Sequence, residues 1–170
     1  RGTIHRDIKP QNVLLSPRGP LITDFGIAFG GDLAAIGDEE DVVIGTPSYL
    51  APEQIRARWR QYGPWTDLYG LGCLAYAMVS GRPPYKASEP LDTMRLHLRA
   101  PIPTLVPRYP VPAGLDEWIS MLLQKGPRAR FQFAADAAHG LANLGDPTGS
   151  WRGSTQPLLK DNSMETMVVE

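Results

Sequence analysis

The chain has little cysteine, no long apolar run and no excess of charge, and each shortage excludes a class of protein. Its single cysteine excludes an internal disulfide and favours a reducing compartment. No apolar stretch approaches the roughly 20 residues that span a bilayer, and no signal peptide opens the sequence. Seventeen basic residues against 18 acidic ones leave a formal charge of −1, which gives no electrostatic case for nucleic acid or an anionic membrane. We therefore expect a cytoplasmic chain without a membrane segment.

Metal-binding patterns of histidine and cysteine are also missing. His97 and His139 have no nearby cysteine or suitably spaced histidine, so neither is a zinc ligand candidate. Cys73 lies between Gly72 and Leu74, where a small buried side chain is expected rather than a reactive thiol.

The most informative stretch is residues 5–12, which is soon followed by Asp24. Transfer of a phosphoryl group to a hydroxyl requires a proton acceptor, a cation near the migrating group and hard oxygen ligands for magnesium. Asp7 can accept the proton and Lys9 can neutralise phosphate charge. Asn12 and Asp24 can supply side-chain oxygens to the metal. This order of residue types indicates phosphoryl-transfer chemistry.

The spacing of these residues predicts a hairpin. Residues 12–16 and 21–24 are short apolar runs, and the segment 17–20 between them is rich in proline and glycine. Such a hairpin would hold Asn12 and Asp24 at neighbouring strand ends.

These motifs resemble those of the protein kinases. Residues 5–12 are similar to the catalytic loop, 24–26 to the metal-binding segment and 51–53 to the end of the activation segment. Residues 67–72 resemble the start of the central helix, and 125–130 the late arginine motif. The resemblance covers residues 2–144. Lys9 and the Gly-Thr-Pro sequence that contains Thr46 resemble the residues of the serine/threonine branch of the family. The sequence of residues 49–54, around the end of the activation segment, resembles that of bacterial members.

The resemblance implies the C-terminal lobe of the protein kinase-like fold, an α+β unit that is mainly α with a small β-hairpin. We expect residues 1–144 to form a partial kinase domain. In that family a preceding small lobe supplies a glycine-rich loop and a strand lysine. No G-x-G-x-x-G occurs in this sequence, so we expect the small N-terminal lobe to be absent from the chain.

Apolar periodicity predicts the helices of this lobe. A buried helix is expected over 67–79, an amphipathic one over 115–122 and a further one over 133–144. A short helix should begin after Ser88. From 145 to 170, glycine, proline, serine and threonine dominate, which predicts a disordered tail.

The family's site residues carry over to matching positions. The resemblance implies Asp7 as catalytic base and Lys9 as the phosphate neutraliser, with Asn12 and Asp24 on Mg²⁺. The nucleotide site would comprise Lys9, Asn12, Asp24 and Leu14, with Leu14 as the apolar floor under adenine. The implied cofactors are ATP and Mg²⁺, and the implied partner is a protein with a serine or threonine acceptor.

The activation segment departs from the family pattern. Many relatives phosphorylate a threonine there, and its phosphate pairs with the arginine at the position of Arg6. Between residues 27 and 45 this chain has no serine, threonine or tyrosine. We hypothesise that Asp38 or Glu40 pairs with Arg6 instead, the alternative being a solvated acidic loop. For Thr46 we favour a substrate-positioning hydrogen bond near the catalytic residues over phosphorylation.

Four residues carry expected structural roles. Glu53 and Arg130 resemble a buried ion pair that fixes the activation segment to later helices. Asp67 resembles the helix-start acid that holds the catalytic-loop backbone. His5 is expected to anchor the loop by packing rather than to act as an acid or base.

Three functional hypotheses follow. The first is the large lobe of an ATP-dependent serine/threonine protein kinase, whose parent protein could be membrane-tethered as in many bacterial relatives. The second is a kinase-like binding module without catalysis. The third is a truncated fragment without independent activity, and the missing small lobe predicts that this chain alone is inactive.

Overall fold

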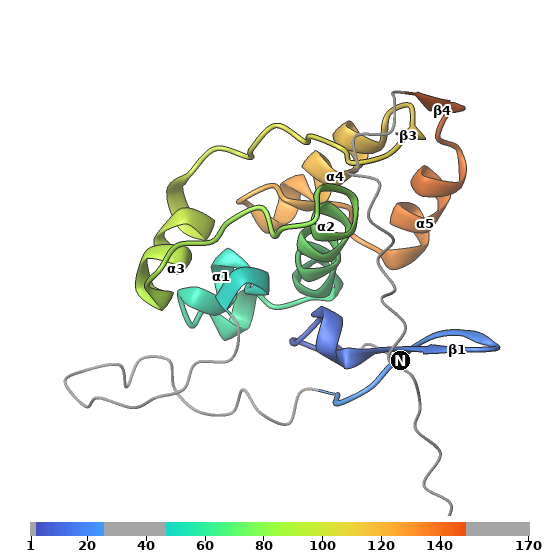
Figure 1. The fold of residues 1–170 in the computed structure, drawn as a ribbon. Helices are drawn as coiled ribbons and strands as arrows, with labels where there is room; N and C mark the ends of the chain where they lie inside the picture. Colours follow the sequence, from blue (N-terminus) through green and yellow to red (C-terminus); the bar gives the residue numbers. More distant parts are fainter. Residues whose placement is uncertain (1–2, 26–46, 149–170) are drawn as a thin grey trace, which may run out of the picture.

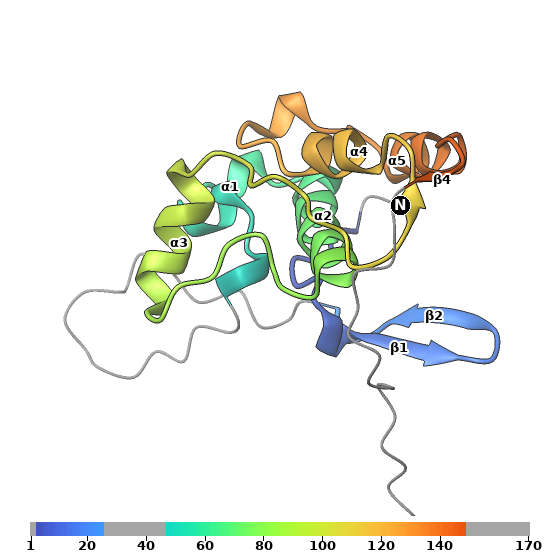
Figure 2. The same cartoon turned by 45° about the horizontal axis from the view of Figure 1, so that its top comes forward.

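The computed structural model describes residues 3–25 and 47–148, and these residues pack around one central helix, α2 (Pro64–Ser80). Figures 1 and 2 show α4 (Leu115–Leu122) and α5 (Ala134–Ala142) on one side of α2, and a hairpin on another. The helix α3 (Pro90–Arg99) packs beside α1 (Pro52–Ile55). No helix among the described residues combines the length and apolarity needed to cross a bilayer.

The predicted hairpin is confirmed. Strand β1 (Val13–Ser16) pairs antiparallel with β2 (Gly19–Ile22) and follows the short 3-10 helix η1 (Pro10–Asn12). The turn is closed by the Ser16 hydroxyl, which donates to the carbonyl of Gly19 at 2.7 Å. Gly19 has φ 109°, a backbone conformation that glycine tolerates best.

The helix α2 is longer than the sequence pattern predicted. It begins at Pro64 rather than Asp67, because proline suits the first helical position. Thr66 closes this end, since its hydroxyl oxygen accepts from the Gly63 N–H at 3.2 Å. The helix ends where predicted, with Gly81 in the left-handed region at φ 79°.

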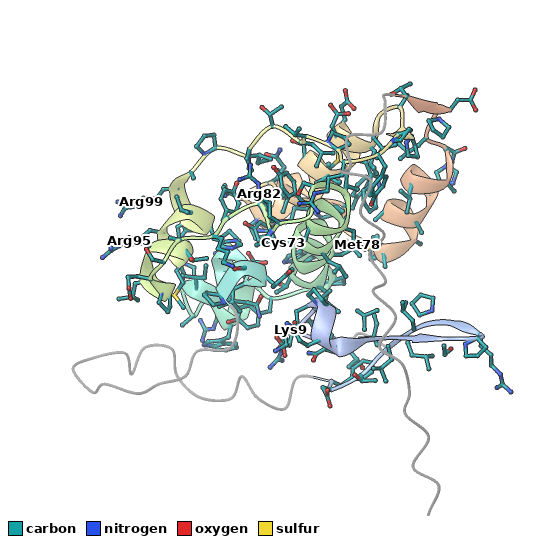
Figure 3. The ribbon with its side chains drawn as sticks, viewed as in Figure 1. Lys9, Cys73, Met78, Arg82, Arg95 and Arg99 are labelled. Atoms are coloured by element: carbon teal, nitrogen blue, oxygen red, sulfur yellow. The ribbon has the colours of Figure 1, made fainter. Side chains whose placement is uncertain are left out.

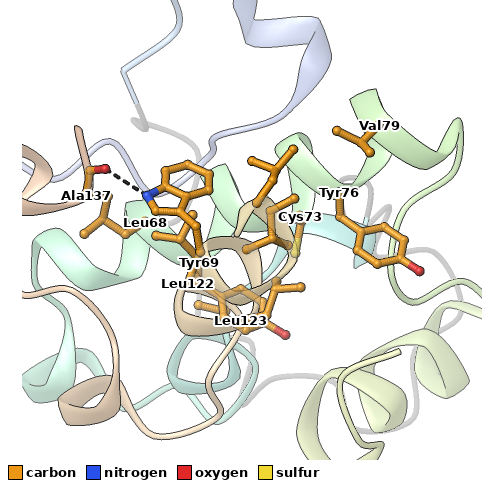
Figure 4. Close-up of a cluster of buried hydrophobic side chains, with 12 residues drawn as sticks. Leu68, Tyr69, Cys73, Tyr76, Val79, Leu122, Leu123 and Ala137 are labelled. Carbon is orange, nitrogen blue, oxygen red and sulfur yellow. Dashed lines mark hydrogen bonds between the residues drawn. The ribbon is translucent and has the colours of Figure 1, made fainter. Parts of the chain in front are cut away.

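The core lies between α2 and α4. Figure 4 shows Tyr69 and Cys73 of α2 packed with Leu122 and Leu123. The helices approach closely at Gly72, where an added Cβ would lie 2.7 Å from the Cβ of Leu122. All four residues of the predicted α4 stripe are buried, namely Leu115, Trp118, Ile119 and Leu122. Burial of each such large apolar side chain stabilises the fold by about 1.5–3 kcal/mol.

Short elements complete the fold around this core. The 3-10 helices η3 (Pro47–Tyr49) and η4 (Trp59–Gln61) flank α1, and η5 (Pro127–Ala129) follows α4. The helix predicted after Ser88 is α3, with Pro90 at its first position. The helix α5 is shorter at both ends than the predicted range 133–144.

A second strand pair includes residues of the segment that the sequence predicted to be a disordered tail. The strand β3 (Val111–Pro112) pairs antiparallel with β4 (Pro147–Thr148). Ala113 supports this pairing, because its N–H donates to Asp146 and its carbonyl accepts from Gly145, both at 3.1 Å. The expectation of disorder from residue 145 is therefore wrong for 145–148. The remainder of the predicted tail, 149–170, lies outside the described residues.

Candidate active site

The backbone before Asp7 is held by side chains from α1 and α2. The Asp67 carboxylate accepts from the N–H groups of His5 and Arg6, each at 2.7 Å. The carbonyl of Arg6 accepts from the side-chain amide nitrogen Nε2 of Gln54, also at 2.7 Å. Arg6 has φ 70°, a left-handed conformation that costs a non-glycine residue roughly 1–2 kcal/mol. These three hydrogen bonds stabilise the strained residue that positions Asp7.

Burial dominates the electrostatics of Asp67. It raises the pKa of the Asp67 carboxyl above its ordinary value, and the hydrogen bonds from the His5 and Arg6 backbones oppose this increase. The carboxylate is therefore committed to the loop backbone and is not free for chemistry of its own.

His5 links the loop of residues 5–12 to the segment around Asp24. Its Nε2 contacts the carbonyl of Thr23 at 2.8 Å, and its Nδ1 accepts from the Asp7 N–H at 3.3 Å. These partners require the tautomer with hydrogen on Nε2. The ring also packs against Phe25, with centroids 4.8 Å apart. These contacts have the character of the packing anchor that the sequence predicted.

Asp7, Lys9 and Asn12 form a compact cluster. Asp7 Oδ2 accepts from Lys9 Nζ at 2.7 Å and from Asn12 Nδ2 at 2.8 Å. Asn12 Nδ2 also donates to the Asp7 carbonyl at 2.8 Å, which fixes the carboxylate relative to its backbone. Figure 3 shows Lys9 at the base of the hairpin, below α2. Both donors use Oδ2, so neither of these two bonds engages the other carboxylate oxygen of Asp7.

The hairpin brings Asn12 and Asp24 together as predicted. The Thr23 N–H donates to the carbonyl of Asn12 at 2.9 Å, immediately beyond the last strand pair. Asn12 is buried, whereas Asp24 is exposed and has φ 57°. A left-handed backbone at an aspartate is a local strain of the kind found at functional sites.

The oxygen donors of this pair fit magnesium. Magnesium is bound through one or two carboxylates together with substrate phosphates and water. Asp24 offers a carboxylate, and the bonds of Asn12 to Asp7 use its Nδ2 and not its side-chain oxygen. The described residues contain no group of three His, Cys, Asp or Glu that could hold a metal by themselves. A cation here would therefore need further oxygen ligands besides the side chains of this pair.

Of the other predicted nucleotide and regulatory residues, Leu14 and Arg6 are among the residues that the structure describes, and three are not. Leu14 is on β1 and is half-exposed. The Arg6 guanidinium lies 5.8 Å from the Tyr62 ring centroid, and its Nε is buried without a hydrogen-bond partner among the described residues. Asp38, Glu40 and Thr46 lie outside the described residues, so the proposed pairing of Arg6 with the acidic loop remains a hypothesis.

The Glu53–Arg130 pair is buried and bidentate. Arg130 Nη1 and Nη2 donate to the two carboxylate oxygens of Glu53 at 2.8 and 2.9 Å. Arg130 also donates to the carbonyls of Gln124 and Trp65, and the Thr66 hydroxyl donates to Glu53. This network fixes α1 to the start of α2 and to the segment before η5.

Sequence reasoning missed the role of Gln54. Its side chain bonds the Arg6 carbonyl through Nε2 and the Ala51 N–H through Oε1, so it connects α1 to the loop of residues 5–12. A local signal existed, because glutamine at the third position of a helix can reach back to the backbone N–H before it. The contact with Arg6, 48 residues away, had no such signal.

Comparison with known proteins gives a consistent result. The family model described as the protein kinase domain matches residues 1–140. The chain is 37% identical over 142 residues to serine/threonine-protein kinase PknA of Mycobacterium tuberculosis, which is 83% of this chain and 32% of PknA. It is 38% identical over 161 residues to serine/threonine-protein kinase PkaA of Streptomyces coelicolor, covering 91% of this chain and 28% of PkaA.

A third relative, serine/threonine-protein kinase PknB of Mycobacterium tuberculosis, is 36% identical over 151 residues, covering 86% of this chain and 24% of PknB. The chain thus spans a third or less of the length of these relatives.

Proposed function

The chain belongs to the protein kinase family, and from this premise we propose that it carries the catalytic loop and the magnesium-binding residues of an ATP-dependent serine/threonine protein kinase. The observation that carries the proposal is the Asp7, Lys9 and Asn12 cluster at the end of the hairpin that bears Asp24. In this proposal residues 1–144 correspond to the C-terminal lobe of the kinase fold, in a cytoplasmic protein.

Asp7 accepts the proton of the substrate hydroxyl on the carboxylate oxygen that Lys9 and Asn12 leave free. General-base catalysis of this kind contributes about 10²–10⁴-fold to a rate. Asn12 Nδ2 holds Asp7 in place, because it donates to both the backbone carbonyl and the Oδ2 of Asp7. Asp67 and Gln54 fix the preceding residue, so the base is preorganised by two helices.

Lys9 supplies positive charge next to the base, where the migrating phosphoryl group would lie. Asn12 and Asp24 would hold the metal through their side-chain oxygens. When bound there, Mg²⁺ would neutralise charge on the phosphates of ATP, and ATP would supply the phosphoryl group. Leu14, half-exposed on β1, would offer an apolar contact to the adenine.

The serine/threonine specificity is supported by the relatives, each of which is named a serine/threonine-protein kinase. The lysine two residues after the base is also the residue that resembled this branch. The acceptor is therefore a serine or threonine hydroxyl on a protein.

Phosphate transfer from radiolabelled ATP to casein tests the proposal. The assay uses the protein as its gene encodes it, because the chain spans a third or less of its relatives. We expect Mg²⁺-dependent transfer to serine and threonine, reduced about 100-fold or more by Asp7→Asn or Asp24→Asn. Asp92→Asn is the matched control, since Asp92 is a carboxylate on α3 outside the cluster. Transfer that survives Asp7→Asn at the control level would remove Asp7 as the base and refute the mechanism.

A further inference from the structure

A groove of about 490 Å³ shares no residue with the Asp7, Lys9 and Asn12 cluster. It is lined by Arg60 and Gln61 of η4 and by Trp65 in the first turn of α2. It is also lined by residues 126–128, at the start of η5, and by Gln132, which follows η5. Residues more than 60 positions apart in the sequence therefore meet here.

The groove is locally basic in a chain whose formal charge is −1. No aspartate or glutamate lines it. The sequence explains this, because segments 54–66 and 118–135 contain three basic residues each and no acidic residue.

Two of these basic residues have partners elsewhere. Arg130 is neutralised by Glu53, and Lys125 Nζ lies 4.0 Å from the Tyr85 ring centroid. Arg60 and Arg128 are the guanidinium groups that line the groove, and neither forms an ion pair with any other described residue. The Arg60 guanidinium also lies 4.9 Å from the centroid of the Trp59 ring, which does not line the groove. Two guanidinium groups without an ion-pair partner in one groove are suited to a doubly charged oxyanion.

The remaining lining residues favour a larger ligand than a free anion. The indole Nε1 of Trp65 already donates to the Gln61 carbonyl at 2.8 Å, so the indole offers the groove an apolar surface. Gln132 uses its Nε2 on the carbonyls of Pro127 and Arg130, so its Oε1 is left to accept from a ligand N–H. The groove thus offers charge for a phosphate, an apolar wall for a side chain and an amide for a peptide backbone.

We propose that this groove binds a phosphoserine or phosphothreonine within a protein segment. This proposal rests on the proposed function in one respect, because the proposed kinase reaction would produce phosphoserine and phosphothreonine on proteins. Nucleic acid is disfavoured, because it is bound by extended basic surfaces that contact several phosphates. Here the charge is confined to one groove. The site would dock a phosphorylated substrate or product away from the catalytic cluster.

Binding to the chain without nucleotide tests this proposal. The probe is a fluorescent alanine peptide with one central phosphothreonine, followed by anisotropy. We expect Arg60→Gln and Arg128→Gln each to weaken binding about tenfold or more, the loss typical of one charge-assisted contact. Arg99→Gln is the control and should leave affinity unchanged, because Arg99 is an exposed arginine on α3 that does not line the groove.

Competition identifies the ligand class. The unphosphorylated peptide should not bind. Inorganic phosphate that competes as well as the phosphopeptide would reduce the site to a simple anion site, and oligothymidine that binds more tightly would make it a nucleic-acid site. Either result would overturn the proposal, as would equal affinity in the two groove variants and the control.

An NMR measurement on the wild-type chain tests the same proposal without relying on the folding of the variants. The indole N–H resonance of Trp65, which lines the groove, should shift as phosphopeptide is added. That of Trp118, buried and bonded to the Ala137 carbonyl, should not. No shift at Trp65 would overturn the proposal.

The outcome is separable from that of the kinase proposal. If Asp7→Asn abolished phosphopeptide binding, the peptide would be binding at the catalytic cluster and the groove would not be its site. Binding that depends on Arg60 and Arg128 would support the groove even if the casein assay failed. An active kinase whose groove variants bind normally would refute the groove alone.

Discussion

Arg130 and Glu53 form a bidentate ion pair across 77 residues of sequence, with side-chain exposures of 0% and 1%. Desolvation offsets most of the attraction within such a pair, so the intact pair is weak evidence of stability. Removal of one partner is different, because it leaves an uncompensated charge or an unsatisfied acceptor in the core. The pair therefore makes the position of α1 depend on both residues.

Substitution of either partner should destabilise the fold. We expect Glu53→Gln and Arg130→Met each to lower the free energy of unfolding by about 3–5 kcal/mol. Arg130→Met should cost more, because Arg130 also satisfies the carbonyls of Gln124 and Trp65. Urea unfolding followed by tryptophan fluorescence measures both.

The exposed pair on α3 is the control for this prediction. Arg95 and Asp92 are joined at 2.6 Å but are 70% and 50% exposed. Exposed pairs of this kind contribute at most about 1 kcal/mol. If Asp92→Asn destabilised the chain as much as Glu53→Gln, burial of the Glu53 pair would not be the cause.

Asp67→Ala should loosen the proposed catalytic loop, residues 5–12. The substitution removes the acceptor of the His5 and Arg6 N–H groups, and an unsatisfied buried donor costs about 1–3 kcal/mol. We expect faster hydrogen exchange at these two amides, measured by NMR. Asp136→Ala, on the exposed first turn of α5, is the control. Unchanged exchange at His5 and Arg6 would show that Asp67 does not hold the loop.

The elements that sequence predicts best are those with a local pattern. The α4 stripe and the glycine end of α2 follow from residue periodicity and type, and both are present. The β3–β4 pair was missed because two-residue strands carry no periodicity. Its partners are brought together by the packing of α4 and α5 rather than by local sequence.

The candidate site divides in the same way. Asp7, Lys9 and Asn12 lie within one short loop, so their meeting could be predicted from spacing. The bond from Gln54 to Arg6 depends on how α1 packs against the loop, which spacing does not encode. The same holds for the Arg60 and Arg128 groove, whose walls belong to distant segments.

Ala57→Gly should stabilise the chain. Ala57 follows α1 with φ 49°, in the left-handed position where helices usually end with glycine. Its N–H donates to Gln54 and that of Arg58 donates to Glu53, both at 2.9 Å, which is the Schellman pattern. Relief of the Cβ clash should increase the free energy of unfolding by about 0.5–1 kcal/mol, measured by urea unfolding.

Ala138→Gly is the matched control for this substitution. Ala138 is exposed within α5, where glycine costs about 1 kcal/mol of helix stability relative to alanine. The two alanine-to-glycine changes should therefore have opposite signs. A loss of stability at both positions would contradict the assignment of strain to Ala57.

His97 of α3 is fully buried in a setting that favours the uncharged ring. Its Nδ1 bonds the Tyr69 hydroxyl at 2.9 Å, and its ring meets the edge of Tyr85 with centroids 4.9 Å apart. Its Nε2 is buried without a hydrogen-bond partner among the described residues. Burial, aided by the nearby Lys125 charge, lowers the pKa of His97 to about 3, while the Ser48 backbone opposes this decrease.

The chain should therefore lose stability as the pH falls below neutral. The unfolded histidine, with a pKa near 6.5, takes up a proton that the folded His97, with a pKa of about 3, does not, so stability decreases from pH 6.5 downward. The loss from this group should reach about 2 kcal/mol at pH 5 relative to pH 7.5. The pKa of Lys125, lowered by burial to about 8, changes stability only above this window. Urea unfolding at both pH values should show the loss in the wild type and in His139→Gln, an exposed control, but not in His97→Gln. An equal loss in His97→Gln would assign the pH dependence to other groups.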